Sequence, residues 1–132
     1  MIKKTELYKF MMVLMIFAMA FNAGAKSKHS NGEVQSGMVT WYGGKGDANY
    51  KLTANGEKFD RSSMTAAHRS LPFGTMVRAT RVDTGASAMF RINNRGPFVR
   101  NRILDVTPAG ADVLDLRQDG AAKIKLEVVS TN

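Results

Sequence analysis

Short segments in which apolar and polar residues alternate dominate the sequence after residue 36. The clearest is 123–129, where Ile124, Leu126 and Val128 alternate with charged residues. A period of two places the apolar side chains on one face of a β-strand. Gly, Asn, Asp and Pro residues separate the segments, so the chain is expected to fold mainly as short strands joined by turns.

The pattern predicts about six short strands and two short helices. Residues 75–82 and 87–92 flank an Asp-Thr-Gly turn, which is typical of a β-hairpin. A helix should begin after Thr107, as the N-cap, with Pro at its first position, and should end before Gly120. A second helix is expected over residues 60–68. The other expected strands are 37–42, 102–106 and 123–129. A small β-barrel fits this set of strands, and an OB-like or SH3-like barrel would have a similar pattern.

The first 25 residues have the features of a signal peptide. Three early lysines precede residues 10–25, which carry no charge and end in a small-x-small site at Ala25. This stretch is shorter than the roughly 20 apolar residues of a spanning helix, so cleavage is expected, with an uncleaved anchor as the alternative. Residues 26–35 are expected to be a disordered lead-in, and 36–132 the folded domain.

The sequence contains no cysteine. This excludes disulfides, a thiol nucleophile, a Cys-ligated metal and a lipid-modified N-terminal Cys. An exported domain of this size must then be held by packing alone, which favours a closed architecture. His29 and His68 are the only histidines; no ligand spacing predicts a metal site, and no cofactor is expected.

The chain is basic, with a formal net charge of +8, and residues 26–132 alone keep +6. Such a charge favours anionic partners. Nucleic acid is not expected, because the basic residues are scattered, no nucleic-acid motif is present and the chain carries an export signal. Outside the inner membrane of a bacterium the abundant anionic polymer is the cell wall, although an ordinary solvated surface would explain any single Arg.

Polar groups that could do chemistry concentrate around Glu57. This carboxylate follows an Asn-Gly turn, with Phe59 and Asp60 just behind it and His68 at the end of the second expected helix. Burial beside an aromatic ring would raise the pKa of Glu57, as a general acid requires, and Asp60 and His68 could hold or relay its proton. The alternative is a solvated turn carboxylate and a histidine that caps a helix.

A second polar cluster follows the hairpin, in residues 91–98 (RINNRGPF). Its Gly-Pro step fixes the backbone, and the flanking Arg and Asn side chains could hydrogen-bond sugar hydroxyls or an anionic group. Alone this cluster is a weak signal, since such loops are common turns.

Taken together, five blocks of the sequence resemble the rare lipoprotein A family, in the family's order and over about residues 36–130. The blocks are 36–43 with Trp41-Tyr42-Gly43, 53–60 (TANGEKFD), 65–75 (TAAHRSLPFGT), 91–99 (RINNRGPFV) and 102–105 (RILD). The resemblance implies a six-stranded double-psi β-barrel with one or two short helices. It also implies a periplasmic lytic transglycosylase that prefers peptidoglycan glycan strands without stem peptides.

The resemblance also assigns site residues. The family's catalytic Glu matches Glu57, and its nearby Asp and His match Asp60 and His68. A further functional Asp of the family falls on Asn94, where this sequence departs from the pattern. Asn has the shape of Asp but carries no charge and takes no proton, so Asn94 and Arg95 are expected to position the substrate.

Two functional interpretations follow. In the first, a secreted or periplasmic enzyme cleaves MurNAc–GlcNAc bonds and leaves 1,6-anhydro ends; Glu57 transfers the proton, tuned by His68 and Asp60. In the second, the same barrel is a non-catalytic peptidoglycan-binding or septal scaffold module, because of Asn94. Expected partners are glycan strands and division-site proteins, and the protein is expected to be a monomer without a lipid anchor.

Overall fold

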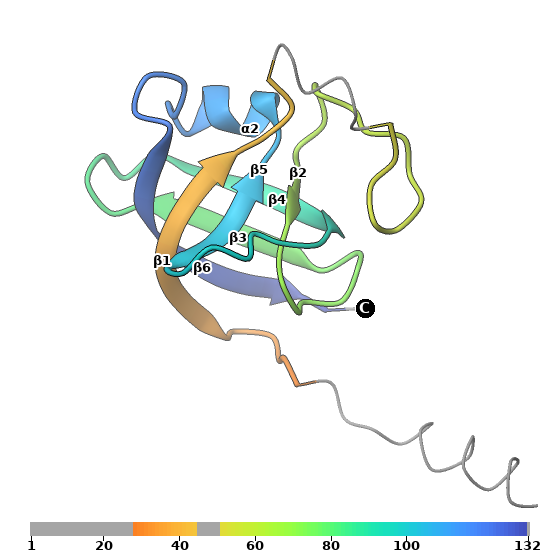
Figure 1. Cartoon of the computed structure of the whole chain (residues 1–132). Coiled ribbons are helices and arrows are strands. Elements are labelled where there is room, and N and C mark those ends of the chain that lie inside the picture. Colours follow the sequence, from red (N-terminus) through yellow and green to blue (C-terminus); the bar gives the residue numbers. More distant parts are fainter. Residues whose placement is uncertain (1–27, 45–50, 132) are drawn as a thin grey trace, which may run out of the picture.

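Six strands close into one barrel in the order β1-β5-β2-β4-β3-β6 (Figure 1). The structure is a computed structural model that describes residues 28–44 and 51–131, so the expected signal peptide lies outside the described residues. The elements are β1 (Val34–Trp41), β2 (Thr65–Ala67), β3 (Met76–Arg81), β4 (Ser87–Asn94), β5 (Arg102–Val106), α2 (Pro108–Val113) and β6 (Ala121–Ser130). The expected six-stranded barrel is thereby confirmed.

The sheet is mixed. β1 pairs in parallel with β5, and β2 in parallel with β4, while the other four neighbouring pairs are antiparallel. The predicted hairpin is β3–β4, in which Val77 lies opposite Phe90. Parallel neighbours need crossover connections, so long segments join the strands of these pairs. The loop that carries Glu57 lies between β1 and β2, whereas Arg91, Asn93 and Asn94 lie in β4.

The inward faces of the strands form the core. Ile124, Leu126 and Val128 of β6 are at most 1% exposed, as their alternation predicts. They pack with Val77, Phe90 and other fully buried side chains in one continuous cluster. Burial of each Leu, Ile or Val side chain contributes about 1.5–3 kcal/mol, so packing holds the fold without cross-links.

The helix predicted over residues 60–68 is wrong. The Asp60 carboxylate accepts hydrogen bonds from the Ser62 amide and the Ser62 and Ser63 hydroxyls, which closes a local turn instead. Residues 65–67 then form β2, buried between β4 and β5. A strand buried on both faces shows no alternation, so its sequence lacks the period-two signal.

The helix predicted after Thr107 is present but shorter than expected. Thr107 caps it through Oγ1, which accepts from the Gly110 amide at 3.3 Å. It ends at Val113, because Asp115 adopts a left-handed φ of 53°. The buried guanidinium of Arg81 donates to the carbonyls of Leu114 and Asp115, which satisfies backbone acceptors at this end.

The structure also differs from the expected disordered lead-in over 26–35. Residues 28–33 lead into β1, which begins at Val34, and hydrogen bonds join this segment to the barrel. In Figure 1 it is the orange trace below β1. The Gly32 amide donates to the Val128 carbonyl at 2.8 Å, and His29 is only 9% exposed. The polar composition of this segment reflects hydrogen bonding to the barrel. No helix within the described residues is long and apolar enough to cross a membrane.

Candidate active site

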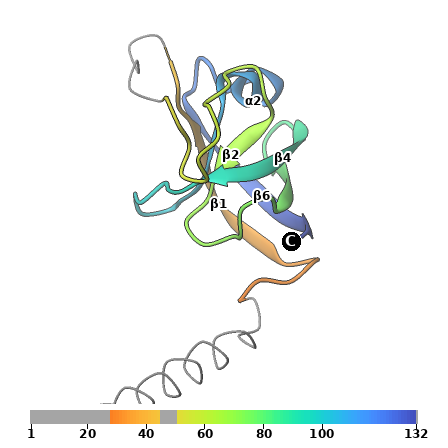
Figure 2. The same cartoon turned by 90° about the vertical axis from the view of Figure 1, so that its right-hand side faces the viewer.

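Glu57 lies in a loop that is attached to the end of β4. The Asn-Gly turn forms as predicted, with Gly56 at a φ of 89°, and the Thr53 amide closes it by donating to the Glu57 carbonyl at 2.8 Å. The Asn55 amide donates to the Asn93 carbonyl at 3.2 Å. This loop and the segment before β2 lie at the same end of the barrel as α2 (Figures 1 and 2).

Arg91 of β4 holds the Glu57 carboxylate at two points. Its Nη1 donates to Oε1 at 2.6 Å and its Nη2 to Oε2 at 2.9 Å. Asn55 donates to Oε1 at 2.8 Å, and Asn93 to Oε2 at 3.3 Å. Arg91 and Asn93 reach the same carboxylate because residues i and i+2 of a strand share a face.

These contacts keep Glu57 ionised. The Arg91 hydrogen bonds, and then that of Asn55, lower the pKa of Glu57 from 4.5 to about 2, against a smaller opposing effect of burial. The predicted rise in this pKa is therefore wrong. The ring of Phe59, expected beside the carboxylate, packs on Tyr42 at 5.2 Å between centroids, in the space left by the missing side chain of Gly43. The Glu57 side chain is nevertheless 39% exposed, so a ligand can reach it.

The Asn94 side chain, at the end of β4, holds the Glu57 loop to the segment that follows β4. Its Oδ1 accepts from the backbone amides of Ala54 and Arg95, both at 3.0 Å. A carboxylate oxygen would accept the same two hydrogen bonds, so Asn94 keeps the geometry that an Asp would have here. It supplies neither the charge nor the proton.

The Arg95 guanidinium is directed at the protein itself. Its Nη1 donates to the carbonyls of Leu71 at 2.8 Å and His68 at 3.2 Å. Its guanidinium lies 3.9 Å from the centre of the Phe73 ring. This arrangement anchors the turn after β2, which is a structural role that the sequence did not indicate.

His68 and Asp60 lie apart from the Glu57 carboxylate. Within the described part of the chain, no hydrogen bond or ion pair joins either side chain to it. His68 is 5% exposed, and burial first, then the positive charges of His29 and Arg95, lowers its pKa to about 4. The hydroxyl and amide of Ser62 lower the pKa of Asp60. The link between His68 and the site is its backbone amide, which donates to the Asn94 carbonyl at 3.2 Å.

Arg91, Asn55 and Asn93 were not identified individually from the sequence as ligands of Glu57. Arg91 and Asn93 lie in the cluster 91–98, and their i, i+2 spacing was the available signal. Among the residues that the structure describes, no three His, Asp or Glu side chains are grouped so that they could hold a metal ion.

Residues 34–126 match the double-psi β-barrel family described as lytic transglycolase. The chain belongs to this family. The match covers all six strands except the end of β6, and it includes the Glu57 loop, β4 and Asn94. The lytic transglycolase domain is thus the part of the chain in which the whole candidate site lies.

Two relatives of this lytic transglycolase domain are named endolytic peptidoglycan transglycosylase RlpA. The protein of Rickettsia bellii is 43% identical over 94 residues, which are 70% of this chain and 41% of the relative. That of Vibrio cholerae is 41% identical over 105 residues, 80% of this chain and 39% of the relative. The chain therefore spans about two fifths of the length of these curated relatives.

Solved structures support the fold of the lytic transglycolase domain. The Streptomyces papain inhibitor superposes with a TM-score of 0.60 at 18% identity, over 76% of this chain and 97% of the other. An expansin of Clavibacter michiganensis superposes with a TM-score of 0.58 at 17% identity. The superposition covers 74% of this chain and 51% of the expansin. These likenesses show the double-psi barrel fold alone.

Proposed function

We propose that this chain is a peptidoglycan lytic transglycosylase that cleaves MurNAc–GlcNAc bonds in glycan strands lacking stem peptides and leaves 1,6-anhydro-MurNAc ends. The observation that carries the proposal is the Glu57 carboxylate. Arg91, Asn55 and Asn93 fix its position, and yet its side chain stays partly open to solvent. A carboxylate held in this way is suited to chemistry on a bound ligand.

Glu57 is the proposed proton-transfer group. Transglycosylation moves one proton from the 6-hydroxyl of MurNAc to the departing glycosidic oxygen, and no water is consumed. One carboxyl can therefore serve both steps, unlike the two carboxyls of a glycoside hydrolase. The net reaction neither gains nor loses a proton.

The resting ionisation of Glu57 slows this chemistry. A carboxyl with a pKa of about 2 is protonated in roughly one molecule in 10⁵ at pH 7. Asn94 cannot supply the missing proton. We therefore propose a weak transglycosylase, in which Asp60 and His68 support the site through the backbone rather than by contact with Glu57.

A second candidate function is favoured by Asn94 itself. Its amide preserves the two hydrogen bonds that hold the Glu57 loop while it removes a charge from the site. The result would be a peptidoglycan-binding or septal scaffold module on the same barrel. Such a module would bind glycan strands, and through them meet division-site proteins, without cleaving anything.

The experiment that separates the two functions is digestion of amidase-treated sacculi, whose glycan strands lack stem peptides. The transglycosylase should release soluble fragments with 1,6-anhydro-MurNAc ends, identified by mass spectrometry. Intact sacculi with their stem peptides are the matched control substrate. Sedimentation with the sacculi and no released fragment would support the binding module instead.

We also propose a periplasmic or secreted location, which suits an enzyme of peptidoglycan. The sequence supports this through the uncharged stretch that ends at Ala25. The intact mass of the exported protein should correspond to a chain that begins near Lys26. A mass that still includes residues 10–25 would contradict cleavage at this position.

A further inference from the structure

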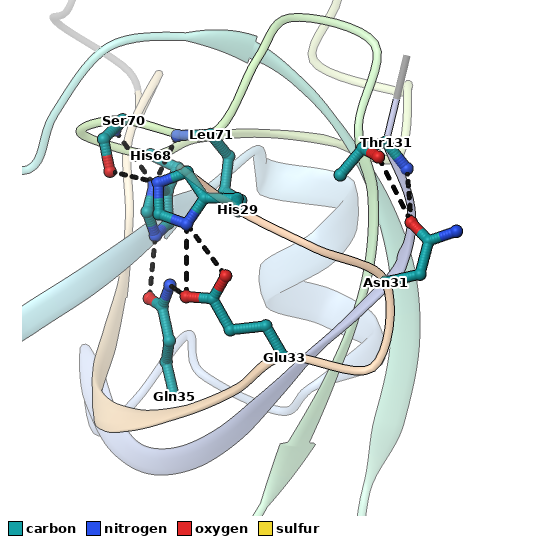
Figure 3. A network of polar contacts seen from close by, with 8 residues as sticks. All are labelled: His29, Asn31, Glu33, Gln35, His68, Ser70, Leu71 and Thr131. Atoms are coloured by element: carbon teal, nitrogen blue, oxygen red, sulfur yellow. Dashed lines mark hydrogen bonds and ion pairs between the residues drawn. The ribbon is translucent and has the colours of Figure 1, made fainter. Parts of the chain in front are cut away.

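A closed ring of hydrogen bonds joins residues 29–35, which include the start of β1, to the turn after β2. Its members are side chains from both segments: His29, Glu33, Gln35, His68 and Ser70 (Figure 3). The rings of His29 and His68 meet edge to face at 6.1 Å, and both are buried. Each ring nitrogen of the two buried imidazoles has a hydrogen-bond partner, whereas Glu33 and Gln35 are half-buried and Ser70 is exposed. Satisfying the two imidazoles matters because a buried polar group without a partner is costly.

The ring fixes the tautomer of His68. Its Nδ1 accepts from the backbone amides of Ser70 and Leu71, both at 3.1 Å, so Nδ1 carries no hydrogen. Nε2 must then carry the hydrogen and donate it to Gln35 Oε1 at 2.9 Å. A protonated imidazole would place a hydrogen on Nδ1 against two N–H groups.

The assignment continues around the ring. Because the Gln35 carbonyl faces His68, its amide group donates to Glu33 Oε1 at 2.8 Å. The Glu33 carboxylate also accepts from His29 Nδ1 at 2.9 Å. His29 Nε2 lies 2.9 Å from the Ser70 hydroxyl, which closes the ring. Hydrogen bonds from Gln35, and then from His29, lower the pKa of Glu33, so it remains an acceptor.

The turn held by this ring leads directly to the candidate site. The His68 amide donates to the Asn94 carbonyl at 3.2 Å, and Arg95 donates to the carbonyls of His68 and Leu71. Asn94 in turn holds the Ala54 amide of the Glu57 loop at 3.0 Å. The contacts therefore run without a break from Gln35 to the loop that carries Glu57.

We infer that Gln35 and Glu33 are positioning residues of the site: they hold His68 in its Nε2–H form and, through the turn after β2, set the position of Asn94. This assigns a site role to a segment that precedes most of the barrel. The effect on kcat that the inference predicts rests on the proposed function. The predicted effect on the NMR signals of His68 and Asn94 does not depend on that function. Charged or titratable groups near His68 are His29 and Glu33 on one side and Arg69 and Arg95 on the other.

An exchange of two side chains tests the inference in the full chain. Gln35→Glu would make two carboxylates face each other where an amide and a carboxylate now meet. The double variant Glu33→Gln/Gln35→Glu restores a donor opposite an acceptor at each step of the ring. In the double variant, the carboxylate at position 35 would accept hydrogen bonds from His68 Nε2 and from the side-chain amide at position 33. The side-chain carbonyl at position 33 would accept the hydrogen bond from His29.

Two further variants complete the set. Gln35→Leu removes both hydrogen bonds of the Gln35 side chain. Asn31→Ala is the control, since Asn31 contacts only Thr131 among the side chains of Figure 3.

The readouts are the ring ¹⁵N signals of His68, the amide signals of Asn94 and Arg95, and kcat and KM on glycan without stem peptides. Gln35→Glu and Gln35→Leu should shift these signals and lower kcat about tenfold with KM nearly unchanged. The double variant should recover kcat to within about threefold, and Asn31→Ala should match the wild type.

Several results would overturn the inference. They are a protonated Nδ1 in wild-type His68, Asn94 signals unchanged in both Gln35 variants, or a double variant no better than Gln35→Glu. If Gln35→Leu does not fold, the single and double exchange variants decide. If the wild type cleaves no glycan, the proposed function fails, while the His68 and Asn94 signals still decide whether the ring positions the site.

Discussion

Arg91 and Glu57 form a two-point ion pair across 34 positions of sequence, with N–O distances of 2.6 and 2.9 Å. The pair places a negative charge at a fixed point on the end of the barrel, and both side chains remain 39% exposed. It also explains why the site rests with Glu57 ionised and is slow to donate a proton.

The titration of Glu57 should reflect this pair. In the wild type its carboxyl should titrate near pH 2, and in Arg91→Met at a higher pH, toward the ordinary value of 4.5, although Asn55 and Asn93 still donate to it. Because the folded pKa lies below the unfolded one, the pair stabilises the fold above about pH 4.5, and this contribution is lost as the pH falls toward 2. Carboxyl ¹³C shifts of Glu57 measure the titration. A wild-type midpoint near 4.5 would show that Arg91 does not hold the carboxylate in solution.

The rate of glycan cleavage should rise as the pH falls from 7 to 4. The protonated fraction of a carboxyl with a pKa of about 2 grows about tenfold for each pH unit in this range. In Arg91→Met the rise should level off at a higher pH than in the wild type, because loss of the Arg91 hydrogen bonds raises the pKa of Glu57. Initial rates of fragment release at several pH values check this. A wild-type rate that is flat from pH 7 to 4 would mean that protonation of Glu57 does not limit turnover.

Replacement of Arg95 should affect stability more than substrate affinity. Arg95→Met removes two hydrogen bonds to carbonyls and the guanidinium above Phe73. The free energy of unfolding should fall by about 1–3 kcal/mol. Urea denaturation measures this loss. Unchanged stability together with a large rise in KM would restore the substrate-positioning role expected from the sequence.

Asn94→Asp should raise turnover on glycan without stem peptides at least tenfold. The new carboxylate can keep the hydrogen bonds from Ala54 and Arg95, so the fold should tolerate it. The added negative charge would stabilise positive charge that develops at the sugar, and a tenfold gain corresponds to about 1.4 kcal/mol. The cleavage rates of the wild type and of Asn94→Asp should be compared with equal amounts of each protein bound to sacculi. Equal rates would show that the charge at this position has no part in the reaction.

The strands were predictable because their signal is local. The alternation in β6 and the turn between β3 and β4 each involve a few consecutive residues, and both predictions are confirmed. β2 was not predictable in this way, because burial on both faces leaves no alternation and the Asp60 turn imitates a helix cap.

The sequence blocks of the candidate site could be found from the sequence, but the contacts between their side chains could not. The blocks around Glu57 and Asn94 were evident, and the structure joins them through the Ala54 amide. The pairing of Glu57 with Arg91, the inward direction of Arg95 and the burial of His68 depend on which strands are neighbours. That arrangement arises from the barrel topology, and so the pKa of Glu57 could not be read from its sequence neighbours.

The most direct test of the central claim compares the wild type with Glu57→Gln on glycan strands without stem peptides. The amide keeps the size of the side chain and can still accept from Arg91, so the melting temperature should stay within a few degrees. Without a proton-transfer group, the release of 1,6-anhydro fragments should fall by about 10²–10⁴-fold. Release near the wild-type rate by a folded Glu57→Gln would contradict the assignment of Glu57 as the group that moves the proton.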